Sequence, residues 1–266
     1  MSIDRGDPGS PWLPAGGKGS DGAEATVGRA PVIALDGPGG AGKSTVARLV
    51  AERCGYTYID TGAMYRAVAL QALAVGMGSG AEPLDAGRVG AMAEGSRIEF
   101  RWQGGAQRVL LDGADVTLAL RDAEVERLVP RVAALPEVRR ALVPLQRRMA
   151  ARGGVVMDGR DIGTCVLPDA DFKFFVTADP QARAERRYRD LAARGERITR
   201  AAVERQLAER DRLDREREVG PLSRAPDAVV LDTTRLSVEE TVARVLAVTG
   251  AWRSTHGEVP SHAPVG

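Results

Sequence analysis

A glycine-rich turn between an apolar run and a helical stretch constrains the fold of this chain more than any other feature. Residues 37–44 read GPGGAGKS and match the pattern GxxxxGK[ST] at every fixed position. They follow the apolar run 32–35, which predicts a buried strand, and they open a helical stretch that stops at Gly55. Glycines let successive backbone N–H groups face one centre, and the helix N-terminus adds positive charge. The segment therefore predicts a phosphate-binding loop in an α/β fold.

Four further apolar runs predict strands separated by helices. They are residues 56–59, 155–157, 172–176 and 228–231. The helices have clear starts, such as Asp179-Pro180 and the capping box at 237–240, and the last helix is expected to end at Gly250. Strands that alternate with helices indicate a doubly wound, five-stranded parallel sheet with helices on both faces. Four of the five runs lead directly into Asp, at the sheet edge where such folds bind ligands.

One stretch interrupts this alternation. Residues 97–102 and 108–111 predict two strands around a Gly104-Gly105 turn, followed by a short extended piece at 115–117. Such an antiparallel insert is too small to have a core of its own. We expect it to be a substrate-side lobe, spanning about 92–132, that packs against the main domain.

The two ends of the chain and its overall composition limit the possible functions. Residues 1–30 and 251–266 are expected to be disordered extensions of a domain at 31–250, because the first is rich in Gly, Pro, Asp and Ser and has no apolar core of a signal peptide. No apolar run is long enough to cross a bilayer. The two cysteines, Cys54 and Cys165, are not in CxxC spacing, so a reduced cytoplasmic protein without disulfides is expected. A net charge of +1 gives no reason to expect nucleic-acid or membrane binding.

The glycine-rich turn supplies the expected nucleotide contacts. The binding residues are Gly37, Pro38, Gly39, Gly40, Ala41, Gly42, Lys43, Ser44 and Thr45. Lys43, one of only three lysines in the chain, would reach the β- and γ-phosphates of ATP, and the Ser44 hydroxyl would bind Mg²⁺. Asp158 follows the run 155–157 without a Glu after it. For this residue, a Mg²⁺ contact through water and a purely structural role are equally open.

Arginines occupy the positions where a second phosphate group would need neutralisation. Arg66 and Arg160 follow two of the predicted strands, and Arg210, Asp214 and Arg217 share one face of a late charged helix at i, i+4 and i+7. The stretch 183–200 contains seven arginines and is a plausible lid over the ATP phosphates. Guanidinium groups suit this task because they bind phosphate through paired hydrogen bonds and stay charged. Ordinary solvated surface charge is the alternative for each of these groups.

Several of these segments together resemble the bacterial cytidylate kinases, members of the P-loop nucleoside monophosphate kinase superfamily. The runs are GPGGAGKST (37–45), DTGAMYR (60–66), VAALPEVR (132–139), DGRDIGT (158–164), ERDRLDRER (209–217) and LDTT-x-LSVEE (231–240). The resemblance covers about residues 31–250. It implies an ATP- and Mg²⁺-dependent CMP or dCMP kinase that acts as a monomer, with the β insert as its acceptor-binding lobe.

The resemblance also implies a role for each matching residue. Lys43, Arg160 and Arg217 would be catalytic. The CMP phosphate would be held by Arg66, Arg160 and Arg217, the cytosine edge by Arg139 and Asp161, and the ribose by Arg210 and Asp214, with Thr61 and Tyr65 lining the acceptor site. Pro130 stands where the family usually has Ser, so discrimination between cytosine and uracil is expected to be looser.

Two other functions remain open from the residues. One is a different P-loop small-molecule kinase, acting on UMP, dephospho-coenzyme A or shikimate. The other is a non-catalytic switch whose ATP occupancy controls a partner. A GTPase is not expected, because the chain has no Asn and so lacks the NKxD base-reading motif.

Overall fold

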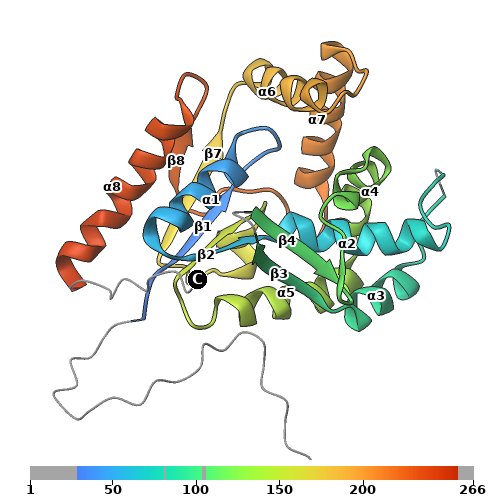
Figure 1. Cartoon of the computed structure of the whole chain (residues 1–266), viewed down its shortest axis with the longest axis horizontal. Helices are drawn as coiled ribbons and strands as arrows, with labels where there is room; N and C mark the ends of the chain where they lie inside the picture. Colours follow the sequence, from blue (N-terminus) through green and yellow to red (C-terminus); the bar gives the residue numbers. More distant parts are fainter. Residues whose placement is uncertain (1–28, 81, 104–105, 257–266) are drawn as a thin grey trace, which may run out of the picture.

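The computed structural model describes residues 29–80, 82–103 and 106–256, and side chains up to Gly250 (Figure 1). The predicted extensions lie outside the described residues over 1–28 and 257–266, as does the Gly104-Gly105 turn.

A five-stranded parallel sheet forms the centre of the molecule. Its order is β2-β6-β1-β7-β8, with every neighbouring pair parallel. The strands are β1 (Val32–Asp36), β2 (Thr57–Asp60), β6 (Val155–Asp158), β7 (Phe172–Thr177) and β8 (Val229–Asp232). The central strand β1 is buried throughout, as expected for a strand covered on both faces. The predicted doubly wound sheet is confirmed.

Helices cover both faces of this sheet. They are α1 (Lys43–Cys54), α2 (Thr61–Ala74), α3 (Ala86–Gly95), α4 (Ala123–Ala134), α5 (Pro136–Ala150), α6 (Pro180–Ala193), α7 (Arg200–Glu216) and α8 (Val238–His256). Successive side chains of β1 point to opposite faces of the sheet. Ile33 and Leu35 belong to the core with α1 and α8, whereas Val32 and Ala34 belong to the core with α2, α4 and α5.

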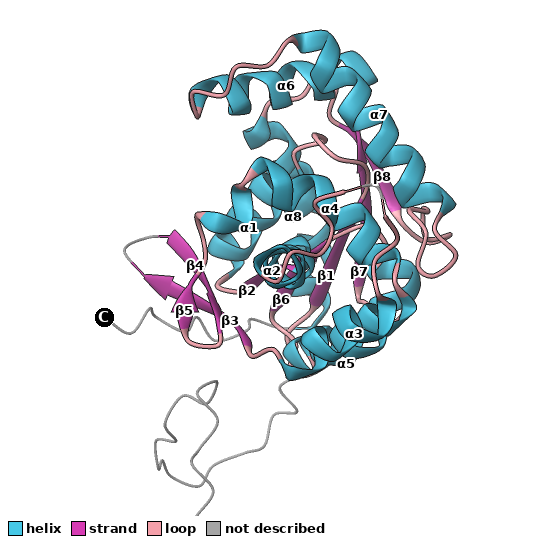
Figure 2. Cartoon of the chain, turned by 90° about the vertical axis from the view of Figure 1, so that its right-hand side faces the viewer, coloured by secondary structure: helices cyan, strands magenta, loops and turns pink. Residues whose placement is uncertain are grey.

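The antiparallel insert is confirmed as a three-stranded sheet. It consists of β3 (Ile98–Gln103), β4 (Ala106–Leu111) and β5 (Ala114–Asp115), in the order β3-β4-β5. Its apolar side chains, among them Phe100 and Val109, join the core that contains α2. The Gln107 amide donates to the Tyr58 carbonyl oxygen at 2.7 Å, which ties the insert to β2. Figure 2 shows the insert beside the main sheet, on the same side as β2.

Helices α6 and α7 form a hairpin at one end of the molecule (Figure 1). They pack together through Ala184, Leu191, Val203 and Leu207. The predicted arginine-rich segment 183–200 corresponds to most of α6 and the connection to α7. The prediction that Arg217 continues the face of α7 is wrong. The helix ends at Glu216, and Arg217 has extended backbone angles.

The last helix begins as predicted and ends later. Its capping box is present, because the Glu240 carboxylate accepts from the Ser237 backbone N–H at 2.8 Å and the Ser237 hydroxyl accepts from the Glu240 N–H at 3.2 Å. The predicted stop at Gly250 is wrong, since α8 continues to His256. A single glycine costs a helix only about 1 kcal/mol relative to alanine, so it does not end a helix by itself. No helix of the described chain combines the length and apolarity that a bilayer crossing requires.

Candidate active site

The phosphate loop connects β1 to α1, with backbone angles that only glycine adopts readily. Gly37, Gly40 and Gly42 have φ values of 142°, 74° and 88°. At Gly37, a side chain would also collide with the carbonyl oxygen of Val176 on the neighbouring strand. The glycines therefore allow this loop to lie directly against the carboxyl end of the sheet.

Lys43 bends back over this loop. Its Nζ donates to the Pro38 carbonyl oxygen at 2.7 Å, and the residue is buried. Burial and the nearby charge of Arg160 lower the pKa of Lys43 to about 7. The surroundings of Lys43 therefore supply too little negative charge to keep its amine fully protonated at neutral pH. Such a group is suited to an anionic ligand.

Asp158 links the loop to the end of β6. One of its carboxylate oxygens accepts from the Ser44 hydroxyl at 2.8 Å, and the other accepts from the Tyr58 hydroxyl at 2.9 Å. Burial and the charge of Asp60 raise the pKa of Asp158 to about 6. The Thr61 hydroxyl donates to the backbone oxygen of Asp158 at 2.7 Å.

The chemistry of Ser44 and Asp158 fits Mg²⁺. Both offer oxygen ligands, which this ion prefers, and Mg²⁺ usually takes one or two protein ligands together with water and substrate phosphates. Within the described ranges, no cluster of three or more His, Cys, Asp or Glu side chains has the arrangement of a metal site. The protein would thus supply part of the coordination, and a bound nucleotide the rest.

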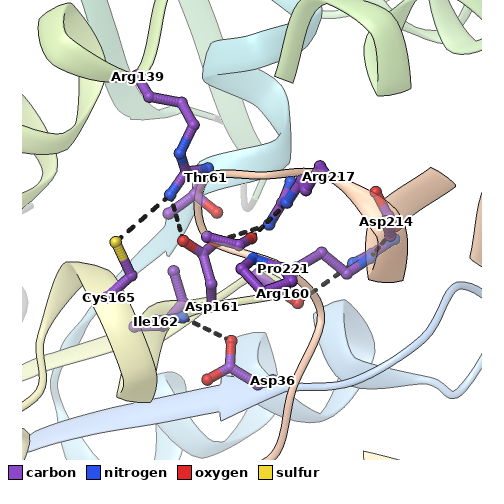
Figure 3. A network of polar contacts seen from close by, with 12 residues as sticks. Asp36, Thr61, Arg139, Arg160, Asp161, Ile162, Cys165, Asp214, Arg217 and Pro221 are labelled. Atoms are coloured by element: carbon purple, nitrogen blue, oxygen red, sulfur yellow. Dashed lines mark hydrogen bonds and ion pairs between the residues drawn. The ribbon is translucent and has the colours of Figure 1, made fainter. Parts of the chain in front are cut away.

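A second group of charges lies around Asp161 (Figure 3). Its carboxylate pairs with Arg217 at 2.9 Å and, through its other oxygen, with Arg139. Arg139 also donates to the Tyr65 hydroxyl at 3.3 Å and to Cys165 Sγ at 3.6 Å. Both arginine side chains are only 3% exposed. The fold thus brings together Tyr65, Arg139, Asp161 and Arg217, which are far apart in sequence.

Two arginines lie close to the phosphate loop. Arg160 pairs with Asp214 at 2.8 Å. The buried Nε of Arg210 has no hydrogen-bond partner among the residues that the structure describes, and burial together with the charge of Arg160 lowers the pKa of this side chain to about 10. A β-carbon on Gly39 would lie 3.7 Å from Arg160 Nη2 and 4.0 Å from Arg210 Cδ. The loop therefore has two arginine side chains beside it, whose positive charges repel each other and would be stabilised by an anion. Arg66 lies in the second turn of α2, paired with Asp60 at 2.6 Å.

Some residues in this region were not singled out by the sequence. Asp36 accepts from the backbone N–H groups of Ile162 and Gly163, both at 2.7 Å, and so fixes the turn that carries Asp161. Burial raises the pKa of Asp36 to about 6. The signal for Asp36 was its place directly after a buried strand. Gly220 had no comparable signal, yet a side chain there would collide with Arg139 and Asp161.

The arginines of the predicted lid have varied partners. Arg183 is buried and bonds to the phosphate loop. Arg187 pairs with Glu126 of α4, whereas Arg189 and Arg200 pair with Glu185 of α6 itself. Arg183 thus contacts the phosphate loop, whereas the other three arginines pair with glutamates.

The chain is similar to known proteins over most of its length. The family model described as cytidylate kinase matches residues 33–250. The cytidylate kinase of Desulfitobacterium hafniense (strain Y51) is 50% identical over 216 residues, covering 81% of this chain and 91% of that protein. The cytidylate kinase of Symbiobacterium thermophilum is also 50% identical over 216 residues, covering 81% of this chain and 94% of the relative. Because the family model spans most of the chain and these relatives share half of its residues over that span, this chain belongs to the cytidylate kinase family.

Proposed function

We propose that the protein transfers the γ-phosphoryl group of ATP to CMP or dCMP, giving ADP and CDP or dCDP. The observation that carries the proposal is the buried group of Arg139, Asp161 and Arg217 at the same edge of the sheet as the phosphate loop. Phosphoryl transfer between two nucleotides requires two phosphate sites and a base site in one place. Family membership supports the same reaction.

On the donor side, the loop amides and Lys43 hold the ATP phosphates. Ser44 would contact Mg²⁺ directly and Asp158 through water, which fits their 2.8 Å separation. When bound, the ion would neutralise charge on the β- and γ-phosphates. Lys43 supplies a point charge that can follow the transferred group, a role in which arginine is a poor substitute.

On the acceptor side, Arg66, Arg160 and Arg217 hold the CMP phosphate. Arg160 also lies beside Gly39 of the donor loop, so one guanidinium group is placed to serve both phosphates. The acceptor phosphate is already a nucleophile, and no general base is needed. Alignment and charge neutralisation are then the main catalytic contributions of the protein.

Base selection falls to Arg139 and Asp161. Each carboxylate oxygen can accept two hydrogen bonds, so Asp161 retains capacity after pairing with its two arginines. It would accept from the exocyclic amine of cytosine, which uracil lacks. Tyr65 and Thr61 line this site, and Arg210 and Asp214 face the ribose. Pro130, a buried residue of α4, replaces a family Ser, and we propose that UMP is consequently a better substrate here than in relatives with that Ser.

The enzyme would depend on Mg²⁺, act as a monomer in the cytoplasm, and bind small-molecule nucleotides rather than nucleic acid or membranes. Segment 183–200 would close over ATP and exclude water, which would otherwise hydrolyse the nucleotide.

The direct test is ADP formation from ATP and Mg²⁺ with CMP, dCMP, UMP, AMP or no acceptor. We expect the highest kcat/KM with CMP and dCMP and little turnover without an acceptor. A higher kcat/KM with a non-pyrimidine substrate would favour a different small-molecule kinase. ATP binding without transfer to any acceptor would favour a switch protein.

ATP binding is also expected to take up protons above neutral pH. Because the pKa of Lys43 is about 7, this side chain is mostly neutral at pH 8. The phosphates of ATP are already ionised at that pH, and their charge would raise the lysine pKa. Uptake should approach about one proton per site. Calorimetric titration in two buffers of different ionisation enthalpy measures it, and Lys43→Met should abolish it. Equal heats in both buffers for the wild type would contradict this linkage.

A further inference from the structure

Two carbonyl groups of the phosphate loop are held from outside the loop by buried side chains. The Gly39 oxygen accepts from Arg183 Nη1 at 2.9 Å, and the Ala41 oxygen accepts from the Thr233 hydroxyl at 3.1 Å. Arg183 is 6% exposed and Thr233 is 3% exposed. Arg183 comes from α6 and Thr233 from the turn after β8, so two separate segments reach the loop.

These contacts determine where the neighbouring amides point. In a planar trans peptide, the C=O of one residue and the N–H of the next point in opposite directions. Holding the Gly39 oxygen outward therefore directs the Gly40 N–H inward, and holding the Ala41 oxygen outward does the same for the Gly42 N–H. Gly40 and Gly42 both have positive φ, at 74° and 88°. Glycine permits this conformation but does not enforce it, because it samples negative φ equally well.

The two donors are themselves fixed. Arg183 pairs with Asp211 of α7 at 2.7 Å and donates to the Ala178 oxygen at 3.2 Å. Asp211 is 2% exposed. The Thr233 hydroxyl accepts from Arg186 at 2.9 Å and shares its proton between the Ala41 oxygen and the Thr177 oxygen, also at 3.1 Å. Neither donor can turn away without breaking a buried contact.

We propose that Arg183, held by Asp211, and Thr233 are positioning residues that orient the loop amides toward the phosphates of the nucleotide. The inference rests on the proposed function for the identity of the donor, ATP. Amides aimed in advance bind a polyphosphate without the cost of reorganising a glycine-rich loop. The arrangement also joins the loop to α7, the helix that carries Arg210 and Asp214.

The test compares threonine variants. Thr233→Val removes the hydroxyl and keeps the shape of the side chain. Thr241→Val is the matched control, because Thr241 is 1% exposed and its hydroxyl donates to a backbone oxygen, that of Ser237, at 2.8 Å, away from the loop. For Thr233→Val, we expect the KM for ATP and the Kd for inorganic tripolyphosphate to rise about five- to tenfold. The KM for CMP should stay unchanged. Thr233→Ser, which keeps a hydroxyl at this position, should have the wild-type KM for ATP and the wild-type Kd for tripolyphosphate.

A second variant tests the arginine. Asp211→Asn does not alter Arg183 itself but removes the negative charge that pairs with its guanidinium group. This variant should therefore bind tripolyphosphate about tenfold or more weakly than the wild type. If Asp211→Asn does not fold, Thr233→Val decides alone. The inference is overturned if Thr233→Val and Thr241→Val bind tripolyphosphate equally, or if only kcat falls, as a loss of folded enzyme would produce. Absence of CDP formation by the wild type would reject the proposed function, whereas the tripolyphosphate comparison would still decide this inference.

Discussion

Lys43→Met is expected to lower kcat with ATP and CMP by about 10²- to 10³-fold, the usual effect of removing one preorganised charge from a transition state. Methionine keeps the length and the apolar stem of the side chain and removes only the ammonium group. Lys43 is 5% exposed, and its Nζ lies at the loop, 2.7 Å from the Pro38 oxygen. In the proposed reaction the charge of the transferred group develops at this position, so the loss should appear mainly in kcat.

The same substitution is expected not to lower stability. The folded pKa of Lys43, about 7, lies below its ordinary value of 10.5. Between these two pH values the unfolded chain binds more protons at Lys43 than the folded chain does. The free energy of unfolding therefore increases as pH rises through this range. At pH 7 and below, the buried ammonium therefore destabilises the fold, and Lys43→Met should melt at the same temperature as the wild type or higher. A variant that loses activity and also melts lower would indicate misfolding instead of a lost catalytic charge.

Lys173→Met provides the matched control for this experiment. Lys173 lies on β7, its side chain is 10% exposed, and it pairs with Asp227 at 2.8 Å. The control removes a similarly shielded ammonium group away from the loop and should retain turnover. Comparable losses in kcat for both variants would contradict the specific role of Lys43.

The sheet and the phosphate loop could be predicted because their signals are local. Each buried strand is a short apolar run, and the loop uses glycine where its own backbone has positive φ, as at Gly40 and Gly42. The insert was predictable for the same reason, from two alternating runs around a turn. The physics that determines these elements acts within about ten residues of sequence.

The pairing of side chains could not be predicted in the same way. Arg139 and Asp161 come from α5 and the turn after β6, and only the folded chain brings them together. Arg217 lies just beyond α7, and its guanidinium group binds Asp161 and the Gly220 oxygen. Arg183 is one of many arginines in its segment, and nothing local distinguishes the one that reaches the loop. Residues that look equivalent in the sequence are distinguished only by the long-range contacts that they make in the folded chain.

Asp161→Asn is expected to remove most of the discrimination between CMP and UMP. The carboxylate can only accept hydrogen bonds, which suits the amine of cytosine and not the carbonyl of uracil. The Asn side chain is nearly the same size and can either donate or accept, so it accommodates both bases. We expect the CMP-to-UMP ratio of kcat/KM to fall by about tenfold or more, the value of one hydrogen bond to a charged group.

This substitution also removes the negative charge between two buried guanidinium groups. Breaking a buried ion pair by removing one partner costs about 3–5 kcal/mol of folding free energy, so part of the lost activity will reflect stability. Asp214→Asn separates the two effects. Asp214 and Asp161 are both 4% exposed, and each pairs with an arginine. The control should lower kcat/KM for CMP and UMP by the same factor, because we propose that Asp214 faces the ribose and not the base. If Asp161→Asn likewise lowers both acceptors equally, then Asp161 serves only as a counterion to Arg139 and Arg217, and the base must be selected elsewhere.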